Sequence, residues 1–162
     1  MNALQIGSLL FAIGGLFDAL IGALTPFVTR MRPLPADSFL QNAAADLILY
    51  GRSPQALLSD DAPLAMLYRT TFDLIGALLL IFGLLQAGVA WFALRHGQAW
   101  ALWLLVVVDI LFIAGWALVY WQYFSRGIGL ATIGIPPNLL VPAVLLIPAT
   151  VLGVIGLQQQ SN

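Results

Sequence analysis

The chain has 162 residues, of which 61% are hydrophobic and 8% are charged, and its formal net charge is −1. Because soluble domains contain roughly 45–50% apolar and about 25% charged residues, this composition indicates one integral membrane domain, residues 1–162. The small net charge provides no basic surface for nucleic acid. With no cysteine and His96 as the one histidine, thiol chemistry is excluded, and we expect neither a metal site nor a cofactor.

The first apolar segment, residues 4–29, is expected to span the membrane, and it contains one charge, Asp18. Small residues recur every three or four positions on the faces beside Asp18: Ser8, Ala12, Gly14, Gly15, Ala19 and Gly22. This spacing lets another membrane helix approach closely. We therefore expect Asp18 to face protein rather than lipid, since an ionisable group in hydrocarbon needs a partner or a function.

The connection that follows, residues 33–62, is expected to form a non-spanning cap at the membrane surface. Asp37 or Ser38 can cap a short helix that Gly51 ends. A second short helix is expected to start at Pro54, because proline is favoured in the first turn of a helix. Such weakly amphipathic helices usually lie in the membrane interface.

The second span, residues 64–94, carries two charges in its first turns, Arg69 and Asp73. They lie four residues apart and so face the same way on a helix. A span of 31 residues extends ~46 Å at 1.5 Å per residue, which exceeds the ~30 Å hydrocarbon core. We therefore expect Arg69 near the membrane boundary, where it pairs with Asp73 or extends its side chain towards water.

The third span, residues 99–124, follows after a short turn and should run antiparallel to the second. Asp109 lies near its middle, and Trp116 and Tyr120 follow along the same face. Two interpretations of these aromatic residues remain open. They belong to the aromatic belt at the membrane interface, or they form the wall of a pocket.

The fourth span, residues 138–157, carries no charge and contains Pro142 and Pro148. The sequence thus predicts an all-α fold, a four-helix membrane bundle with short interfacial helices in the first connection. Arginines gather near the span ends on the side of the long connection, so the positive-inside rule predicts that this side is cytoplasmic and that both termini lie outside.

The depths of the three intramembrane aspartates predict which of them meet. Counted from the side of the long connection at 1.5 Å per residue, Asp18 lies ~18 Å, Asp73 ~15 Å and Asp109 ~26 Å into the membrane. Asp18 and Asp73 are therefore expected to meet across a helix interface, with Asp109 deeper in the bundle.

Two explanations of the aspartates remain open. In the first, Arg69 neutralises Asp73, and a protonated Asp109 donates a hydrogen bond to a neighbouring helix. In the second, an acidic and aromatic pocket binds an apolar or amine-bearing small molecule through ion pairing and cation–π attraction. The residues expected to bind this ligand are Asp18, Arg69, Asp73, Asp109, Trp116 and Tyr120.

The chain carries no Ser/His/Asp or Cys/His set, so we do not expect an enzyme. The hypothesis for its function is a non-enzymatic accessory subunit or ligand-binding module. Its environment is the lipid bilayer, with a membrane protein partner or a homo-oligomer as candidate assemblies. The alternative is a proton- or cation-coupled transporter, or a permeation component, that uses the intramembrane aspartates.

The length, the four spans and the opening segment SLLFAIGGLFDALIGAL resemble small bacterial four-helix membrane proteins of the DoxX-like kind. This resemblance covers the general layout and the glycine-rich first helix. It implies a multi-pass protein of the bacterial inner (plasma) membrane.

Overall fold

The computed structural model describes residues 1–30 and 42–161, and these residues are folded entirely as helices and turns. Four helices of this part are long and apolar enough to cross a membrane: α1 (Ala3–Val28), α4 (Ala62–Phe92), α5 (Ala99–Phe124) and α7 (Pro137–Ser161). The prediction of an all-α fold with four spans is therefore confirmed. The shorter elements are α2 (Ala43–Tyr50), α3 (Pro54–Asp60), the 3-10 turn η2 (Leu94–His96) and α6 (Leu130–Ile133).

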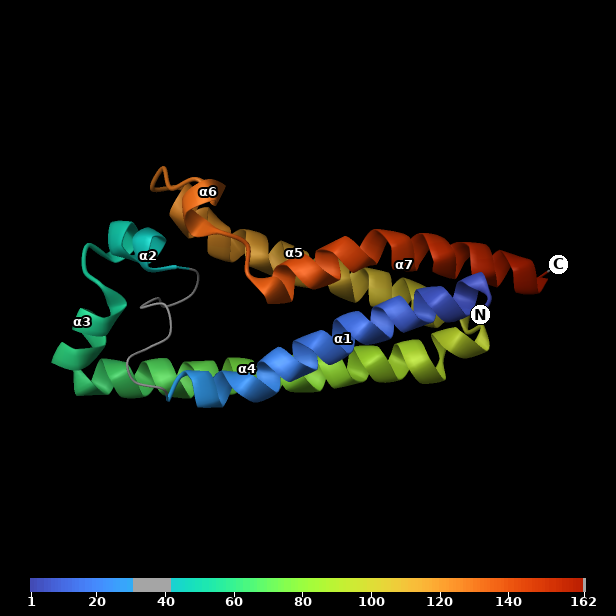
Figure 1. Ribbon diagram of the computed structural model, residues 1–162, viewed down its shortest axis with the longest axis horizontal. Coiled ribbons are helices and arrows are strands. Elements are labelled where there is room, and N and C mark those ends of the chain that lie inside the picture. Colours follow the sequence, from blue (N-terminus) through green and yellow to red (C-terminus); the bar gives the residue numbers. More distant parts are fainter. Residues whose placement is uncertain (31–41, 162) are drawn as a thin grey trace.

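Both termini lie at one end of the elongated bundle, and α2 and α3 lie at the other (Figure 1). We call these the terminal end and the cap end. Helix α1 makes extensive contacts with α4 and with α7, whereas α5 packs on α7 and only sparsely on α4. Helix α1 is also the most buried of the four spans. It is therefore the central helix of the bundle, packed between α4 and α7.

Glycines on both helices bring α1 and α4 into close contact. A Cβ atom on Gly22 would lie 2.4 Å from the backbone nitrogen of Leu80, and one on Gly83 would lie 2.3 Å from the backbone oxygen of Gly15. Real Cβ atoms do not approach other atoms this closely. The small-residue face predicted on the first span is therefore the face that packs against α4, as in other membrane helix pairs.

The contact between α1 and α7 uses the same device at the terminal end. A Cβ atom on Gly7 would lie 2.8 Å from the backbone nitrogen of Gly153, and one on Gly156 would lie 2.3 Å from that of Leu4. The backbone of α1 is therefore in direct contact with the backbones of α4 and α7.

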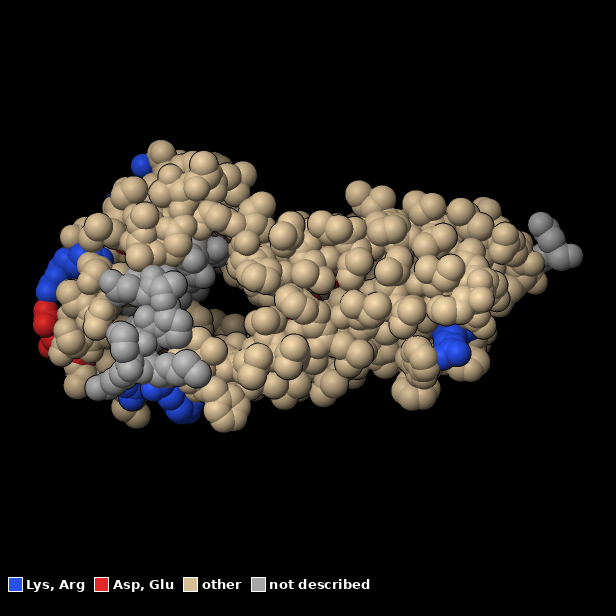
Figure 2. Space-filling view, in the orientation of Figure 1, with Lys and Arg blue, Asp and Glu red and all other residues tan. Residues whose placement is uncertain are grey.

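Two separate hydrophobic clusters hold the ends of the bundle. The terminal cluster comprises Leu4, Phe11, Ala12, Ala90, Leu94, Ala101, Leu102, Leu105 and Ala149. The cap cluster comprises Ala45, Tyr120, Tyr123, Ile128, Ile133 and Leu139. Between them α4 and α5 diverge (Figure 1), and the molecular surface is hollowed between the bundle and the cap end (Figure 2).

Helix α2 has a side-chain cap at its start and a glycine at its end. The Asn42 side chain accepts a hydrogen bond from the Ala45 backbone N–H at 2.9 Å, and Gly51 ends the helix in the left-handed conformation with φ 72°. The predicted stop at Gly51 is confirmed, whereas the caps proposed at Asp37 and Ser38 fall outside the described residues. The second short helix starts at Pro54 as predicted.

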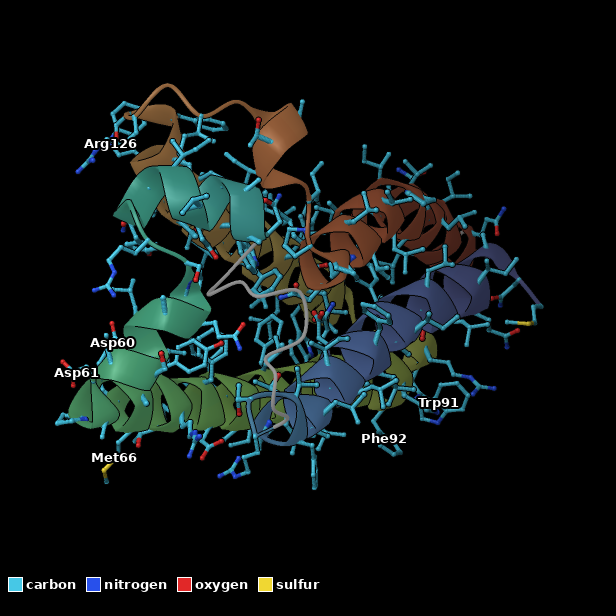
Figure 3. All side chains as sticks on the ribbon, turned by 60° about the vertical axis from the view of Figure 1, so that its left-hand side comes forward. Asp60, Asp61, Met66, Trp91, Phe92 and Arg126 are labelled. Carbon is cyan, nitrogen blue, oxygen red and sulfur yellow. The ribbon has the colours of Figure 1, made fainter. Side chains whose placement is uncertain are left out.

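Charged side chains concentrate at the cap end, and a broad uncharged surface covers most of the bundle (Figure 2). Asp60, Asp61 and Arg126 lie at this end, and Trp91 and Phe92 project outwards from the opposite end of α4 (Figure 3). Phe92 is 75% exposed. This distribution matches a bundle that faces lipid along its length and water at the cap end.

Candidate functional site

Two of the three predicted intramembrane aspartates come together inside the bundle. Asp18 on α1 is 0% exposed and Asp109 on α5 is 2% exposed, and the two carboxyl groups are close enough to interact electrostatically. Gln86 on α4 donates a hydrogen bond from Nε2 to Oδ1 of Asp109 at 3.0 Å. We call these three residues the acidic site.

The acidic site contains more hydrogen-bond acceptors than donors. Both carboxyl oxygens of Asp18 and the Oε1 atom of Gln86 are buried and have no hydrogen-bond partner among the described residues. Buried polar groups nearly always have one. Leaving such a group unsatisfied costs about 1–3 kcal/mol, and more if it is charged. An added hydrogen-bond donor or an added positive charge would therefore stabilise the acidic site.

Glycines of α1 let Gln86 lie directly against this helix, one turn before Asp18. A Cβ atom on Gly14 would lie 3.8 Å from Nε2 of Gln86, and one on Gly15 would lie 2.8 Å from the backbone nitrogen of Ala87. The backbones of α1 and α4 are thus in contact one helical turn before Asp18. As a result, the amide of Gln86 lies against α1 and reaches Asp109 on α5.

Apolar groups border the acidic site along the bundle axis. On the terminal side, one turn before Asp109, Leu105 is 2% exposed and belongs to the terminal cluster. On the cap side, the rings of Phe82 on α4 and Phe112 on α5 are stacked with centroids 5.5 Å apart. The acidic site thus lies between a closely packed cluster and an aromatic pair.

Asp73 lies apart from the acidic site, and its partner is not the predicted one. Its carboxylate accepts two hydrogen bonds from the guanidinium of Arg30, at 2.8 and 2.6 Å. This bond raises the pKa of Arg30 above its ordinary value. The predicted pairing of Asp73 with Arg69 is therefore wrong. The end of α1 places Arg30 over α4 at the level of Asp73, so a contact between helices replaces the contact within one helix.

The predicted meeting of Asp18 with Asp73 is also wrong, because Asp109 is the carboxyl that lies beside Asp18. Counting depth along each helix assumes that all spans end at one level. In the structure Asp109 lies beside Asp18, although it is further from the cap-side end of its own helix. Depths counted along the two helices are therefore not comparable, and the last turns of α5 pack in the cap cluster with Tyr120 and Tyr123.

Tyr120 belongs to the cap cluster and Trp116 packs against it, so both lie apart from the acidic site. Tyr120 is 6% exposed, its hydroxyl donates to the backbone oxygen of Gly134 at 3.1 Å, and its ring centroid lies 6.0 Å from that of Trp116. Among the candidate ligand-binding residues, the structure therefore joins Asp18 with Asp109. It leaves Arg69 and Asp73 at the cap-side end of the α1–α4 pair, and Trp116 and Tyr120 at the end of α5.

Sequence reasoning missed a third buried carboxyl group. Asp46 on α2 is 0% exposed and accepts a hydrogen bond from the Tyr123 hydroxyl at 2.8 Å. Burial raises the pKa of nearby Tyr50, and the charge of Asp46 adds to this effect. The Asn42 side chain also donates to the backbone oxygen of Ile133 at 2.7 Å. These bonds dock α2 on α5 and α6.

Gln86 was also not among the predicted site residues, because a single neutral amide in an apolar helix does not by itself indicate a binding site. A signal was nevertheless present. Gln86 lies on the same helical face as Gly83 and Ala90, which are both buried against α1. A polar residue on the small-residue face of a membrane helix is expected to hydrogen-bond across the bundle.

Within residues 1–30 and 42–161, no group of three or more His, Cys, Asp or Glu side chains could hold a metal ion. Comparisons of the chain with known protein families, with characterised proteins and with solved structures find no match. By the length and hydropathy of its helices, the chain is a small membrane protein with four candidate spans. The resemblance to DoxX-like proteins therefore has no support beyond this general layout.

Proposed function

We propose that the protein is a non-enzymatic, membrane-embedded binding module, and that its acidic site holds the protonated nitrogen of a lipophilic amine. The observation that carries this proposal is the set of three buried oxygen acceptors without a donor: two on Asp18 and one on Gln86. An ammonium group carries three N–H donors and one positive charge. It would donate to the unpaired acceptors and place a positive charge beside the two carboxyl groups.

The charges on the bundle favour a ligand that brings its own cation. Arg30, which follows the end of α1, is already bonded to Asp73. In the described part of the chain, Asp109 is the one charged group that acts on Asp18. A carboxylate without a partner in the membrane interior costs several kcal/mol. A bound cation, or a proton, removes this cost.

The surroundings favour a ligand with an apolar body. The stacked rings of Phe82 and Phe112 lie within one turn of Gln86 and Asp109, and aromatic faces attract cations as well as apolar groups. A molecule that partitions into the bilayer could place its amine on the carboxyl groups and its apolar part against the rings.

Hydroxyl groups on α1 and α7 are already engaged in hydrogen bonds to the backbone, which supports a non-enzymatic role. Ser8 donates to the backbone oxygen of Ala90 at 2.6 Å, Thr25 to that of Ile21 at 2.8 Å, and Thr150 to that of Leu146 at 2.6 Å. Such bonds within and between membrane helices are structural. The polar groups of the acidic site are then two carboxyl groups and an amide, which are suited to binding rather than to nucleophilic attack.

The proposal is tested by thermal unfolding of the purified protein with phenethylamine and with phenethyl alcohol, which have the same apolar body. A ligand at about 100 times its Kd stabilises the folded state by about 2.7 kcal/mol. At about 2–4 °C per kcal/mol, phenethylamine should raise the Tm by roughly 5–11 °C, and the alcohol should not. Equal stabilisation by the alcohol would contradict the proposal.

Matched variants separate the acidic site from other carboxylates. Asp18→Asn and Asp109→Asn should each abolish stabilisation by phenethylamine. Asp60→Asn should preserve it, because Asp60 pairs with Arg52 at the surface. Retained stabilisation in both site variants would refute the proposal.

We also propose that the cap end faces the cytoplasm of a bacterial inner membrane. Arg30, Arg52, Arg69 and Arg126 lie near the span ends on the cap side, whereas Arg95 alone lies in the turn at the terminal end. This asymmetry supports the orientation through the positive-inside rule. A role as accessory subunit to a membrane partner is compatible with the same site.

A further inference from the structure

We propose that the acidic site exchanges a proton for its ligand: the empty site holds a proton on the Asp18–Asp109 pair, and binding of a protonated amine releases it. This inference rests on the proposed function and specifies how binding is regulated. It makes ligand affinity depend on pH even though the amine itself stays charged.

The arrangement of donors and acceptors requires a proton when the site is empty. Gln86 uses Nε2 to donate to Asp109, so its Oε1 can only accept. An ionised Asp18 can also only accept, and nothing in the described residues donates to it. A protonated Asp18 instead supplies one O–H donor. Either Asp109 or Oε1 of Gln86 is suited to accept it.

The other three spans contribute no basic group at the level of Asp18. On α4 the side chain facing the site is the neutral Gln86, and the charged Asp73 is bonded to Arg30, twelve residues or ~18 Å along α1 from Asp18. On α5 the facing group is Asp109. Helix α7 contributes no Asp, Glu, His, Lys or Arg.

The charged groups of η2 are engaged at the terminal end. The Arg95 guanidinium lies 4.1 Å from the ring centroid of Trp91, and Nδ1 of His96 lies 3.0 Å from the backbone oxygen of Phe92. Two carboxyl groups that face each other without a base repel when both are ionised, so a shared proton stabilises the pair.

The exchange is balanced in charge and in atoms. A protonated amine enters, the O–H bond of the carboxyl group breaks, and the proton leaves to solvent. N–H···O hydrogen bonds form between the ammonium and the freed oxygens, and no covalent bond to the ligand forms. One positive charge replaces another, so the net charge of the site in the membrane is unchanged.

Isothermal titration calorimetry of the intact protein with phenethylamine tests the exchange. Titrations at about pH 7 keep a primary amine protonated, since such groups titrate near pH 10. The experiment is performed in phosphate and in Tris, whose ionisation enthalpies differ. We expect the binding enthalpies to differ by the amount that corresponds to about one proton released per bound amine. Asp60→Asn should give the same proton count.

Binding with the same enthalpy in both buffers would overturn the exchange and leave the proposed binding function intact. No binding in either buffer, together with no thermal stabilisation, would overturn both. A second readout needs no variant. The Kd for phenethylamine should fall about tenfold for each unit by which the pH is raised, over the range where one proton is released. A Kd that stays constant from about pH 5 to about pH 8, where a primary amine remains protonated, would also contradict the exchange.

Discussion

The close contact between α1 and α4 makes a strong prediction about Gly83 and Gly88, which lie five residues apart on α4. A Cβ atom on Gly83 would lie 2.3 Å from the backbone oxygen of Gly15 and 2.4 Å from the backbone nitrogen of Ala19, whereas one on Gly88 would have nothing within 4 Å. Gly83→Ala should therefore push α1 away from α4. Gly88→Ala should be accommodated without any shift.

The magnitude follows from the difference between the two variants. Alanine is favoured over glycine in a helix by about 1 kcal/mol, and both variants share this gain. Overpacking of a closely packed interior costs about 1–3 kcal/mol, and only Gly83→Ala incurs it. At about 2–4 °C per kcal/mol for a chain of this size, the Tm of Gly83→Ala should lie roughly 2–12 °C below that of Gly88→Ala.

The assay is thermal unfolding of both variants in one detergent, followed by tryptophan fluorescence at equal protein concentration. The comparison with Gly88→Ala removes the helix-propensity term and any general effect of an added methyl group. Equal Tm values for the two variants would refute the backbone contact between α1 and α4. They would also remove the basis for placing Gln86 beside Asp18.

Three further predictions concern the cap end. Tyr123→Phe removes one donor to the buried Asp46 and should cost about 1–3 kcal/mol; faster hydrogen exchange in α2 is the expected result, and unchanged exchange would count against this docking bond. Asp73→Asn should leave the Tm close to that of the original protein, because its ion pair with Arg30 is solvent-exposed; a large loss would mean that the pair is buried in lipid. Ser59→Cys, in a chain without cysteine, should react with a membrane-impermeant maleimide only from the cytoplasmic side; labelling from outside would invert the topology.

The membrane class, the four long helices and the burial of Asp18 could be predicted from the sequence, because hydropathy and small-residue spacing are local properties of one segment. Apolar segments of this length have few alternatives to a membrane helix. The small-residue face of the first span also predicted a close helix contact, and the glycines at Gly15 and Gly22 make it.

The pairing of side chains between helices could not be predicted in the same way. Arg69 and Asp73 satisfy the four-residue spacing, yet Asp73 bonds to Arg30, 43 residues away. The choice depends on where α1 ends against α4, and spacing within one helix carries no such information. Depth counting paired Asp18 with the wrong carboxyl group for the same reason, since the placement of α5 in the assembled bundle sets the level of Asp109.

The burial of Asp46 could not be predicted because it depends on how the cap docks. An amphipathic octapeptide next to the membrane would ordinarily direct its carboxylate to water. In the structure α2 packs against the end of α5, and Tyr123, which is 77 residues from Asp46, donates to it. Such a contact is specified by the assembled bundle rather than by either segment.

The central claim is that Asp18, Gln86 and Asp109 form a binding site for a protonated amine. Its most direct test is a crystal structure of the protein with para-bromophenethylamine, in which anomalous scattering from bromine locates the ring. We expect one bromine peak beside Phe82 and Phe112, with the amine nitrogen within hydrogen-bond distance of Asp18. Bromine peaks confined to the lipid-facing surface, with the acidic site unchanged, would contradict it.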